Sequence, residues 1–161
     1  MHIPAELIVM ALAAFPILEM RGAMPVGKLL GLPMEANFFW SIAGCILPVF
    51  FILKFLDPVS KFLMKHSKWF NRLLTGIFAK TRARHNKRFD EAGAIILILA
   101  TAIPLPGFGA WTGALIAYLF DVHYWKAILL IFIGVIIMAI ILALTIESVS
   151  QVPDMVKFFI K

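Results

Sequence analysis

The stretch Leu18–Pro25, which reads Leu-Glu-Met-Arg-Gly-Ala-Met-Pro, places an acid, a base, a glycine and a proline inside a run of apolar residues. Ionisable residues at membrane depth are costly and usually face a cavity or a partner, so this stretch marks a candidate functional site. The alternative is a loop at the membrane surface. A second interruption, Ile103–Gly109, carries two prolines and two glycines in the other half of the chain.

The composition indicates an integral membrane protein. The chain has 161 residues, of which 62% are hydrophobic and 15% are charged, whereas soluble domains carry about 25% charged residues. Residues 1–4 contain no Lys or Arg, so we expect the first apolar segment to be retained rather than cleaved as a signal peptide. The single cysteine, Cys45, excludes a disulfide framework within one chain.

The first third of the chain predicts a re-entrant hairpin followed by a spanning helix. Pro4–Leu18 has fifteen residues, fewer than the roughly 20 that cross a bilayer as a helix. A second short apolar piece, Val26–Leu32, follows the interruption, and such a pair predicts a re-entrant hairpin over residues 4–33. One long kinked helix over the same residues is the alternative. Residues 37–56 predict a transmembrane helix.

Residues 57–89 predict a cytoplasmic, basic amphipathic segment at the membrane interface. Asp57 is expected to cap a new helix, with Pro58 at its first position. An excess of Lys and Arg favours the cytoplasmic side, and apolar residues at helical spacing favour an interfacial helix rather than a nucleic-acid site. The residues expected to contact anionic lipid headgroups are Lys61, Lys65, Lys68, Arg72, Arg82, Arg84, Lys87 and Arg88.

The second half repeats this layout. Residues 90–121 predict a second re-entrant hairpin, residues 124–146 a second transmembrane helix and residues 147–161 a tail. A shift of about 85 residues aligns Glu6 with Glu91 and Gly22 with Gly107. Because the basic segment between the copies lies on one side, the copies are expected to be inverted, as in many transporters. The predicted fold is an all-α integral membrane protein, a single membrane domain with both termini outside.

The two interruptions are expected to meet near the membrane midplane. A helix over Pro4–Leu18 would carry Glu19 roughly 20 Å deep at about 1.5 Å per residue, near the middle of a core of about 30 Å. Glu19 can then pair with Arg21 or take up a proton. Helices starting near Pro25 and Gly107 would add positive dipole ends, which favour an anion. The candidate substrate- or ion-binding residues are Glu19, Arg21, Gly22, Pro25, Pro104, Pro106, Gly107, Gly109 and Trp111.

The alternative for this stretch is a salt bridge between Glu19 and Arg21 that only holds the turn. The sequence contains no Walker-type phosphate loop, no paired His/Cys metal spacing and no Ser-His-Asp arrangement. We therefore expect no enzyme activity, no metal and no cofactor.

The stretches from Glu19 to Pro25 and from Pro104 to Trp111 resemble the small multidrug export protein family, which is similar to the DedA/SNARE-associated (VTT) membrane proteins. The resemblance covers residues 6–146. It implies facing re-entrant hairpins, a homodimer, and transport or flipping of lipid-linked phosphates such as polyprenyl phosphate with proton coupling; Glu19 matches the acid of the first hairpin. DedA-type second hairpins carry arginines, whereas this chain has none after Arg88, so Arg21 would supply the positive charge.

Three functions remain open at this point. The first is a transporter or flippase that moves an anionic lipid-linked substrate by alternating access, with Glu19 as the proton-linked acid. The second is a small cation or drug exporter in which Glu19 binds the substrate or the proton. The third is a membrane scaffold without transport. The expected partners are membrane lipids, an anionic lipid or small-molecule substrate, and protons, with no nucleic acid.

Overall fold

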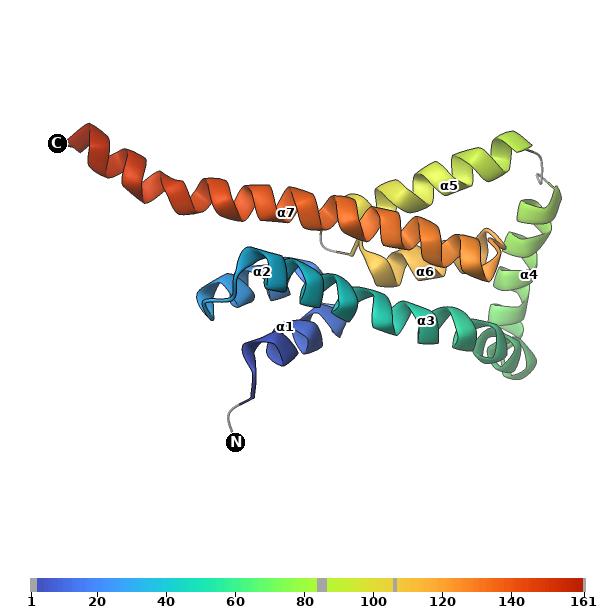
Figure 1. The fold of residues 1–161 in the computed structure, drawn as a ribbon. Coiled ribbons are helices and arrows are strands. Elements are labelled where there is room, and N and C mark those ends of the chain that lie inside the picture. The colour runs from blue at the N-terminus through green and yellow to red at the C-terminus, as the bar shows by residue number, and fades with distance from the viewer. Residues whose placement is uncertain (1–2, 84–86, 106, 161) are drawn as a thin grey trace. The chain divides into compact units, whose positions relative to one another are not determined.

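The computed structural model describes residues 3–83, 87–105 and 107–160, and for residues 77–78, 80–83, 87–90 and 150–160 it describes the backbone alone. Over these residues the chain is helical and contains no strand, which confirms the predicted all-α class. The helices are α1 (Ala5–Ala14), α2 (Glu19–Leu29), α3 (Met34–His66), α4 (Lys68–Ala83), α5 (Lys87–Ala102), α6 (Ala110–Leu119) and α7 (Tyr124–Ile160) (Figure 1).

Two of the helices, α3 and α7, are long and apolar enough to cross a membrane by length and composition. The other apolar helices are short: α1 and α6 have 10 residues each, about 15 Å at the helical rise. A helix of that length does not cross a hydrocarbon core of about 30 Å. The chain therefore alternates pairs of short helices with long helices.

Contacts divide the chain into two compact units. The first unit contains residues 1–45 and 136–161, and the second contains residues 46–135. Each short-helix pair lies within one unit, α1 with α2 in the first and α5 with α6 in the second.

In the first unit, a proline decides where the first short helix ends. The residue before a proline is pushed out of the helical region, and Phe15, which precedes Pro16, is extended at φ −78° and ψ 134°. The chain turns over residues 15–18, and α2 then packs along α1 (Figure 1). The turn thus comes before Glu19, whereas the sequence placed the interruption at residues 19–25.

A close backbone approach packs α3 against α1 in the same unit. A Cβ atom built on Gly44 would lie 2.7 Å from Ala13 Cβ and would also collide with the Met10 carbonyl oxygen. Only glycine fits at such a distance. Ala13 at this contact is fully buried.

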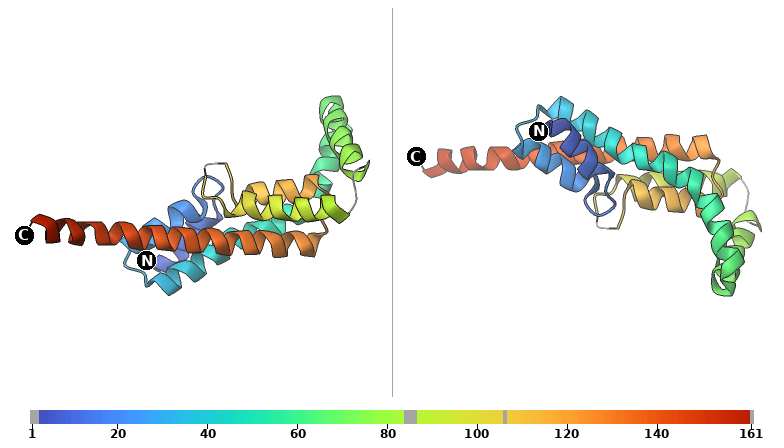
Figure 2. Two further views of the ribbon diagram at one scale, coloured as in Figure 1. Left: turned by 90° about the horizontal axis from the view of Figure 1, so that it is seen from above. Right: turned by 90° about the horizontal axis from the view of Figure 1, so that it is seen from below.

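In the second unit, α5 and α6 pack side by side around the predicted interruption (Figure 2). The turn between them is held by the Gly109 N–H, which donates to the Ala100 carbonyl at 3.1 Å. Gly134 of α7 lies against Thr101 of α5, since a Cβ on it would be 2.6 Å from Thr101 Cβ. Gly134 and Gly44 therefore play the same packing role in the two halves, 90 residues apart.

The ends of α2 and α6 are also alike. Both finish in a Schellman motif with a left-handed residue at its end, Gly31 at φ 78° and Asp121 at φ 55°. The Leu32 N–H donates to the Gly27 carbonyl at 3.0 Å, and the Val122 N–H donates to the Ala117 carbonyl at 2.9 Å. These shared local features support a repeated layout, and its inversion in a membrane stays a prediction.

The segment from Asp57 to Ala83 differs from the expectation. No helix begins at Asp57, because α3 continues through Pro58 to His66, and the next helix, α4, begins after Ser67, whose Oγ accepts from the Phe70 N–H at 3.5 Å. The carboxylate of Asp57 instead accepts from Lys61 one turn further along α3 at 2.6 Å. Figure 2 shows that the last turns of α3 bend away from the axis of the preceding part of the helix, as expected for a helix with an internal proline.

Candidate functional site

Glu19 is a buried acid at the start of α2, with 2% of its surface exposed. Its φ is 45°, a left-handed conformation that non-glycine residues adopt only when the surrounding structure holds them there. The Glu19 N–H donates to the Phe15 carbonyl at 2.8 Å, which closes the turn that follows α1. Tight packing of this turn therefore holds the strained residue that carries the carboxylate.

Arg21 is the charged partner of Glu19. Its Nη2 lies 3.4 Å from Glu19 Oε2, and its side chain is 17% exposed. Among the residues that the structure describes, Arg21 Nε is buried without a hydrogen-bond partner. A buried N–H without a partner is costly, so Arg21 can hydrogen-bond a further acceptor at this site.

The position of α2 corrects the predicted anion site. Glu19 opens the helix and Pro25 lies inside it, exposed, with Gly22 half-buried between them. No helix therefore starts at Pro25, and the positive end of the α2 dipole lies at the Glu19 carboxylate, which it stabilises. The physical reason is that Pro16, rather than the Gly and Pro of the quoted stretch, ends the preceding helix.

A polar face of α3 lies in the same unit. Asn37, Ser41 and Cys45 follow one another at intervals of four residues and are buried. Asn37 Nδ2 donates to the Met24 carbonyl at 2.8 Å, and Ser41 Oγ donates to Asn37 Oδ1 at 3.4 Å. We call these three residues the α3 polar face.

The thiol of Cys45 joins this face to the acid. It donates to the Ala13 carbonyl at 3.4 Å, and it lies close enough to Glu19 and Arg21 to interact with both charges. The first unit thus collects an acid, a base, an amide, a hydroxyl and a thiol among apolar helices.

The second predicted stretch lies in the other unit. Helix α6 begins at Ala110 with Gly109 as its N-cap at φ 146°, and no side chain caps it. Gly107 is exposed at φ 85°, and its carbonyl accepts from Thr112 Oγ1 at 2.6 Å. Pro104 and Trp111 are half-buried, and Pro106 lies outside the described residues. The expected start near Gly107 is thus shifted to Ala110, and a meeting of the two stretches stays a prediction.

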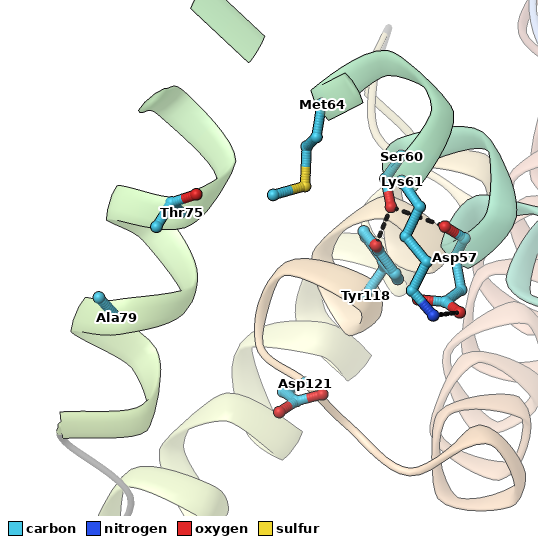
Figure 3. Close-up of a pocket in the computed structure, with 8 residues that line it drawn as sticks. All are labelled: Asp57, Ser60, Lys61, Met64, Thr75, Ala79, Tyr118 and Asp121. Atoms are coloured by element: carbon cyan, nitrogen blue, oxygen red, sulfur yellow. Dashed lines mark hydrogen bonds and ion pairs between the residues drawn. The ribbon is translucent and has the colours of Figure 1, made fainter. Parts of the chain in front are cut away.

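A cavity of about 420 Å³ lies in the second unit between the last turns of α3, helix α4 and the end of α6 (Figure 3). Ser60, 5% exposed, donates to the Asp57 carbonyl at 3.0 Å and forms a hydrogen bond with the Tyr118 hydroxyl. The lining residues are Asp57, Ser60, Lys61, Met64, Thr75, Ala79, Tyr118 and Asp121.

The predicted headgroup residues are exposed where the structure describes them. Lys61 and Lys65 project from the end of α3, and Lys68 and Arg72 from the start of α4. Arg84 lies outside the described residues, and so do the side chains of Arg82, Lys87 and Arg88.

Two features of the structure were not predicted from the sequence. The α3 polar face could have been predicted from the sequence, because a polar residue recurs at every fourth position of an apolar helix from Asn37 to Cys45. The cavity could not have been predicted from the sequence, because Ser60 and Tyr118 are 58 residues apart and only the fold brings them together. Within the described part of the chain no group of His, Cys, Asp and Glu could hold a metal ion.

Comparison with known proteins gives a family match. The family described as "Putative small multi-drug export protein" matches residues 19–141, which run from the start of α2 to about the middle of α7. No curated protein and no solved structure matches the chain.

Proposed function

The chain belongs to the small multi-drug export family, and from this membership and the buried Glu19 we propose that it exports small cationic organic molecules in exchange for protons. Two helices long enough to cross a bilayer support a membrane location. The observation that carries the proposal is an acid 2% exposed among apolar helices. An intramembrane carboxylate of this kind binds either a proton or a cation, which is what an exchanger requires.

The geometry of α2 removes one of the two helix starts that were expected to bind an anion. The expected helix start at Pro25 would have supplied backbone N–H groups to an anion, but that residue lies inside α2. The positive end of α2 and Arg21 instead face the carboxylate of Glu19. When a proton binds Glu19, the carboxylate loses its charge and Arg21 loses its ion-pair partner. Proton binding at Glu19 is therefore coupled to the position of the Arg21 guanidinium.

The proposed transport cycle uses two re-entrant pairs, α1–α2 and α5–α6, in inverted copies. Both α1 and α6 are too short to span, and irregular backbone at membrane depth is tolerated when protein or water surrounds it. Alternating exposure of Glu19 to the two sides would then move a substrate one way and a proton the other. The exposed basic residues of α3 and α4 would hold this assembly at an anionic lipid surface.

A second candidate function is transfer of an anionic lipid-linked phosphate such as polyprenyl phosphate. It is favoured by Arg21 Nε, which is buried and unbonded among the described residues, because a phosphate oxygen would satisfy it.

The test is transport by purified protein in vesicles with an imposed pH gradient and an ethidium probe. Glu19→Gln should reduce proton-driven efflux to the level of empty vesicles, because the variant can bind neither a proton nor a cation. Glu35→Gln is the matched control, since Glu35 is an exposed acid in the first turn of α3, and it should transport like the wild type.

The substrate charge distinguishes the candidates. If Arg21→Gln abolishes binding of a polyprenyl phosphate while ethidium efflux is absent from the wild type, the lipid-phosphate function replaces the proposed one. If neither substrate moves in wild-type vesicles and Glu19→Gln changes only the unfolding temperature, the protein is a scaffold.

A further inference from the structure

An open hollow lies along one side of α4 in the second unit. Its volume of about 400 Å³ falls within the range of roughly 300–1,000 Å³ found for small-molecule sites. The described residues that line the hollow are Lys68, Asn71, Arg72, Thr75, Gly76 and Ala79. They recur at intervals of three and four residues in α4, so they share one face of the helix.

Two of these lining residues are charged, and both charges are positive. Lys68 and Arg72 are exposed and lie one helical turn apart, and neither forms an ion pair within the part of the chain that the structure describes. Lys61, by contrast, is paired with Asp57 at 2.6 Å. Residues 58–89 contain no Asp or Glu, so α4 itself supplies no carboxylate that could neutralise the two cations. Both side chains are therefore available to an external anion.

A neutral donor adjoins the two cations on the same face. Thr75 Oγ1 donates to Asn71 Oδ1 at 3.0 Å, which orients the amide and leaves its Nδ2 protons unused among the hydrogen bonds found for Asn71. The ammonium of Lys68 and the guanidinium of Arg72 also only donate. Three donor groups at neighbouring positions of one face suit the oxygens of a phosphate, which accepts several charge-assisted hydrogen bonds.

Apolar side chains beside these donors distinguish a lipid from a soluble anion. Trp69 is 67% exposed and Leu73 is 44% exposed, and each directly follows one of the two cations in α4. Tryptophan is enriched at the membrane interface, and the apolar residues of a basic helix at that interface gain free energy when acyl chains cover them. A soluble phosphate would leave both side chains in water, whereas a phospholipid offers them an acyl chain.

From these donors and their apolar neighbours we propose that α4 binds the phosphate of an anionic phospholipid. Lys68 and Arg72 contact the phosphate oxygens, and Asn71 Nδ2 donates to one of them. Trp69 and Leu73 lie against the acyl chain. Such a site holds one lipid in a defined place, which the general attraction of basic residues to an anionic surface does not. It uses none of the residues of the proposed export site, so the two can be tested separately.

Native mass spectrometry of the full chain in detergent tests the site, because it counts the lipids bound to each chain during a titration with phosphatidylglycerol. The Lys68→Gln, Arg72→Gln variant should bind the first phosphatidylglycerol about tenfold or more weakly, since it loses charge-assisted hydrogen bonds to the phosphate. The matched control, Lys54→Gln, Lys126→Gln, removes two exposed positive charges elsewhere in the same unit and should leave that affinity nearly unchanged.

Asn71→Ala separates a defined site from general attraction. The substitution leaves the net charge unchanged, so a surface that only attracts lipid by its charge would bind phosphatidylglycerol as before. Loss of the amide donor from a phosphate site should weaken binding of the first lipid about threefold or more. Because Asn71 is exposed on α4, the unfolding temperature of the variant in lipid-free detergent should match that of the wild type.

Three results would overturn the inference. Equal losses in the two double variants, or unchanged lipid binding in Asn71→Ala, would leave only general attraction. Displacement of phosphatidylglycerol by millimolar inorganic phosphate, at an ionic strength matched with chloride, would assign the hollow to a soluble anion. Loss of the first lipid in Arg21→Gln, with the Lys68→Gln, Arg72→Gln variant unaffected, would place the phosphate at Arg21 and favour the second candidate function.

Discussion

At Gly44 the backbone of α3 lies so close to α1 that no side chain fits. A Cβ atom there would be 2.7 Å from Ala13 Cβ, and overpacking of this kind costs about 1–3 kcal/mol. Gly134 meets Thr101 in the same way in the second unit. Single glycines thus set the distance between a short helix and a long helix in each half.

We predict that Gly44→Ala lowers the unfolding temperature of the purified protein, because α1 must move away from α3. Gly76→Ala is the matched control: Gly76 lies inside α4 with nothing within 4 Å of an added Cβ. There the substitution should be neutral or stabilising by up to about 1 kcal/mol, since alanine favours a helix more than glycine does. A stable Gly44→Ala protein would show that the two helices separate easily.

Glu19 illustrates what one residue contributes to the candidate site. Its acidity and its place in an apolar run were readable in the sequence, and they led to the site hypothesis. Its left-handed φ of 45° and its ion pair with Arg21 depend on how the turn after Pro16 packs. Sequence spacing alone does not specify that packing.

At the scale of elements, the α3 polar face joins α2 to α3. Asn37 is fully buried and donates to the Met24 carbonyl, and Gly27 leaves the space that its amide occupies. A hydrogen bond from a buried side chain to another helix fixes the register of the pair, because the unpaired carbonyl and amide would cost free energy in an apolar surrounding.

We predict that Asn37→Ala destabilises the protein by about 1–3 kcal/mol, the cost of an unsatisfied buried group, measured as a lower unfolding temperature in detergent. Asn71→Ala provides the comparison, since Asn71 is exposed on α4 and accepts only the Thr75 hydroxyl among the hydrogen bonds found for it. Its effect should stay within about 0.5 kcal/mol. Equal effects of the two substitutions would remove the structural role of the α3 polar face.

Helix boundaries were predicted unevenly, for identifiable reasons. The interruption before α6 was predicted correctly because prolines and glycines cluster between Ile103 and Gly109. The start at Asp57 was wrong because proline, although it is enriched at the first position of helices, can also lie inside a helix and kink it, as Pro58 does in α3. In α3 the Ser60 bonds to the Asp57 carbonyl and to Tyr118 support the helix across Pro58.

At the scale of the whole molecule, the proposed re-entrant pairs make a topological prediction. If residues 57–89 are cytoplasmic and α3 and α7 alone cross the bilayer, two re-entrant pairs place both termini outside. We expect membrane-impermeant thiol reagents to label Glu35→Cys from outside, and Gly76→Cys only after the membrane is opened. Both substitutions require a Cys45→Ser background, since Cys45 is the only native cysteine.

A tag at the C-terminus gives the second readout. The tag should react with antibody on intact cells if α5 and α6 enter the membrane from the cytoplasmic side and return to that side, because α7 then ends outside. A cytoplasmic C-terminus would mean that each short pair crosses the membrane as a kinked helix, and the inverted arrangement would be wrong.

The sequence by itself determined the membrane class, the two long apolar helices, the presence of paired short helices and the acid at the centre of the site hypothesis. These features follow from composition and from local signals such as proline, glycine and apolar run length, which act within a few residues. Only the tertiary structure decided that Glu19 begins a helix beside Arg21 and Cys45 and that Ser60 and Tyr118 line one cavity. It also decided that Gly44 and Gly134 let a long helix approach a shorter one closely. Those features are contacts between residues distant in sequence, and their geometry depends on how side chains of different helices pack.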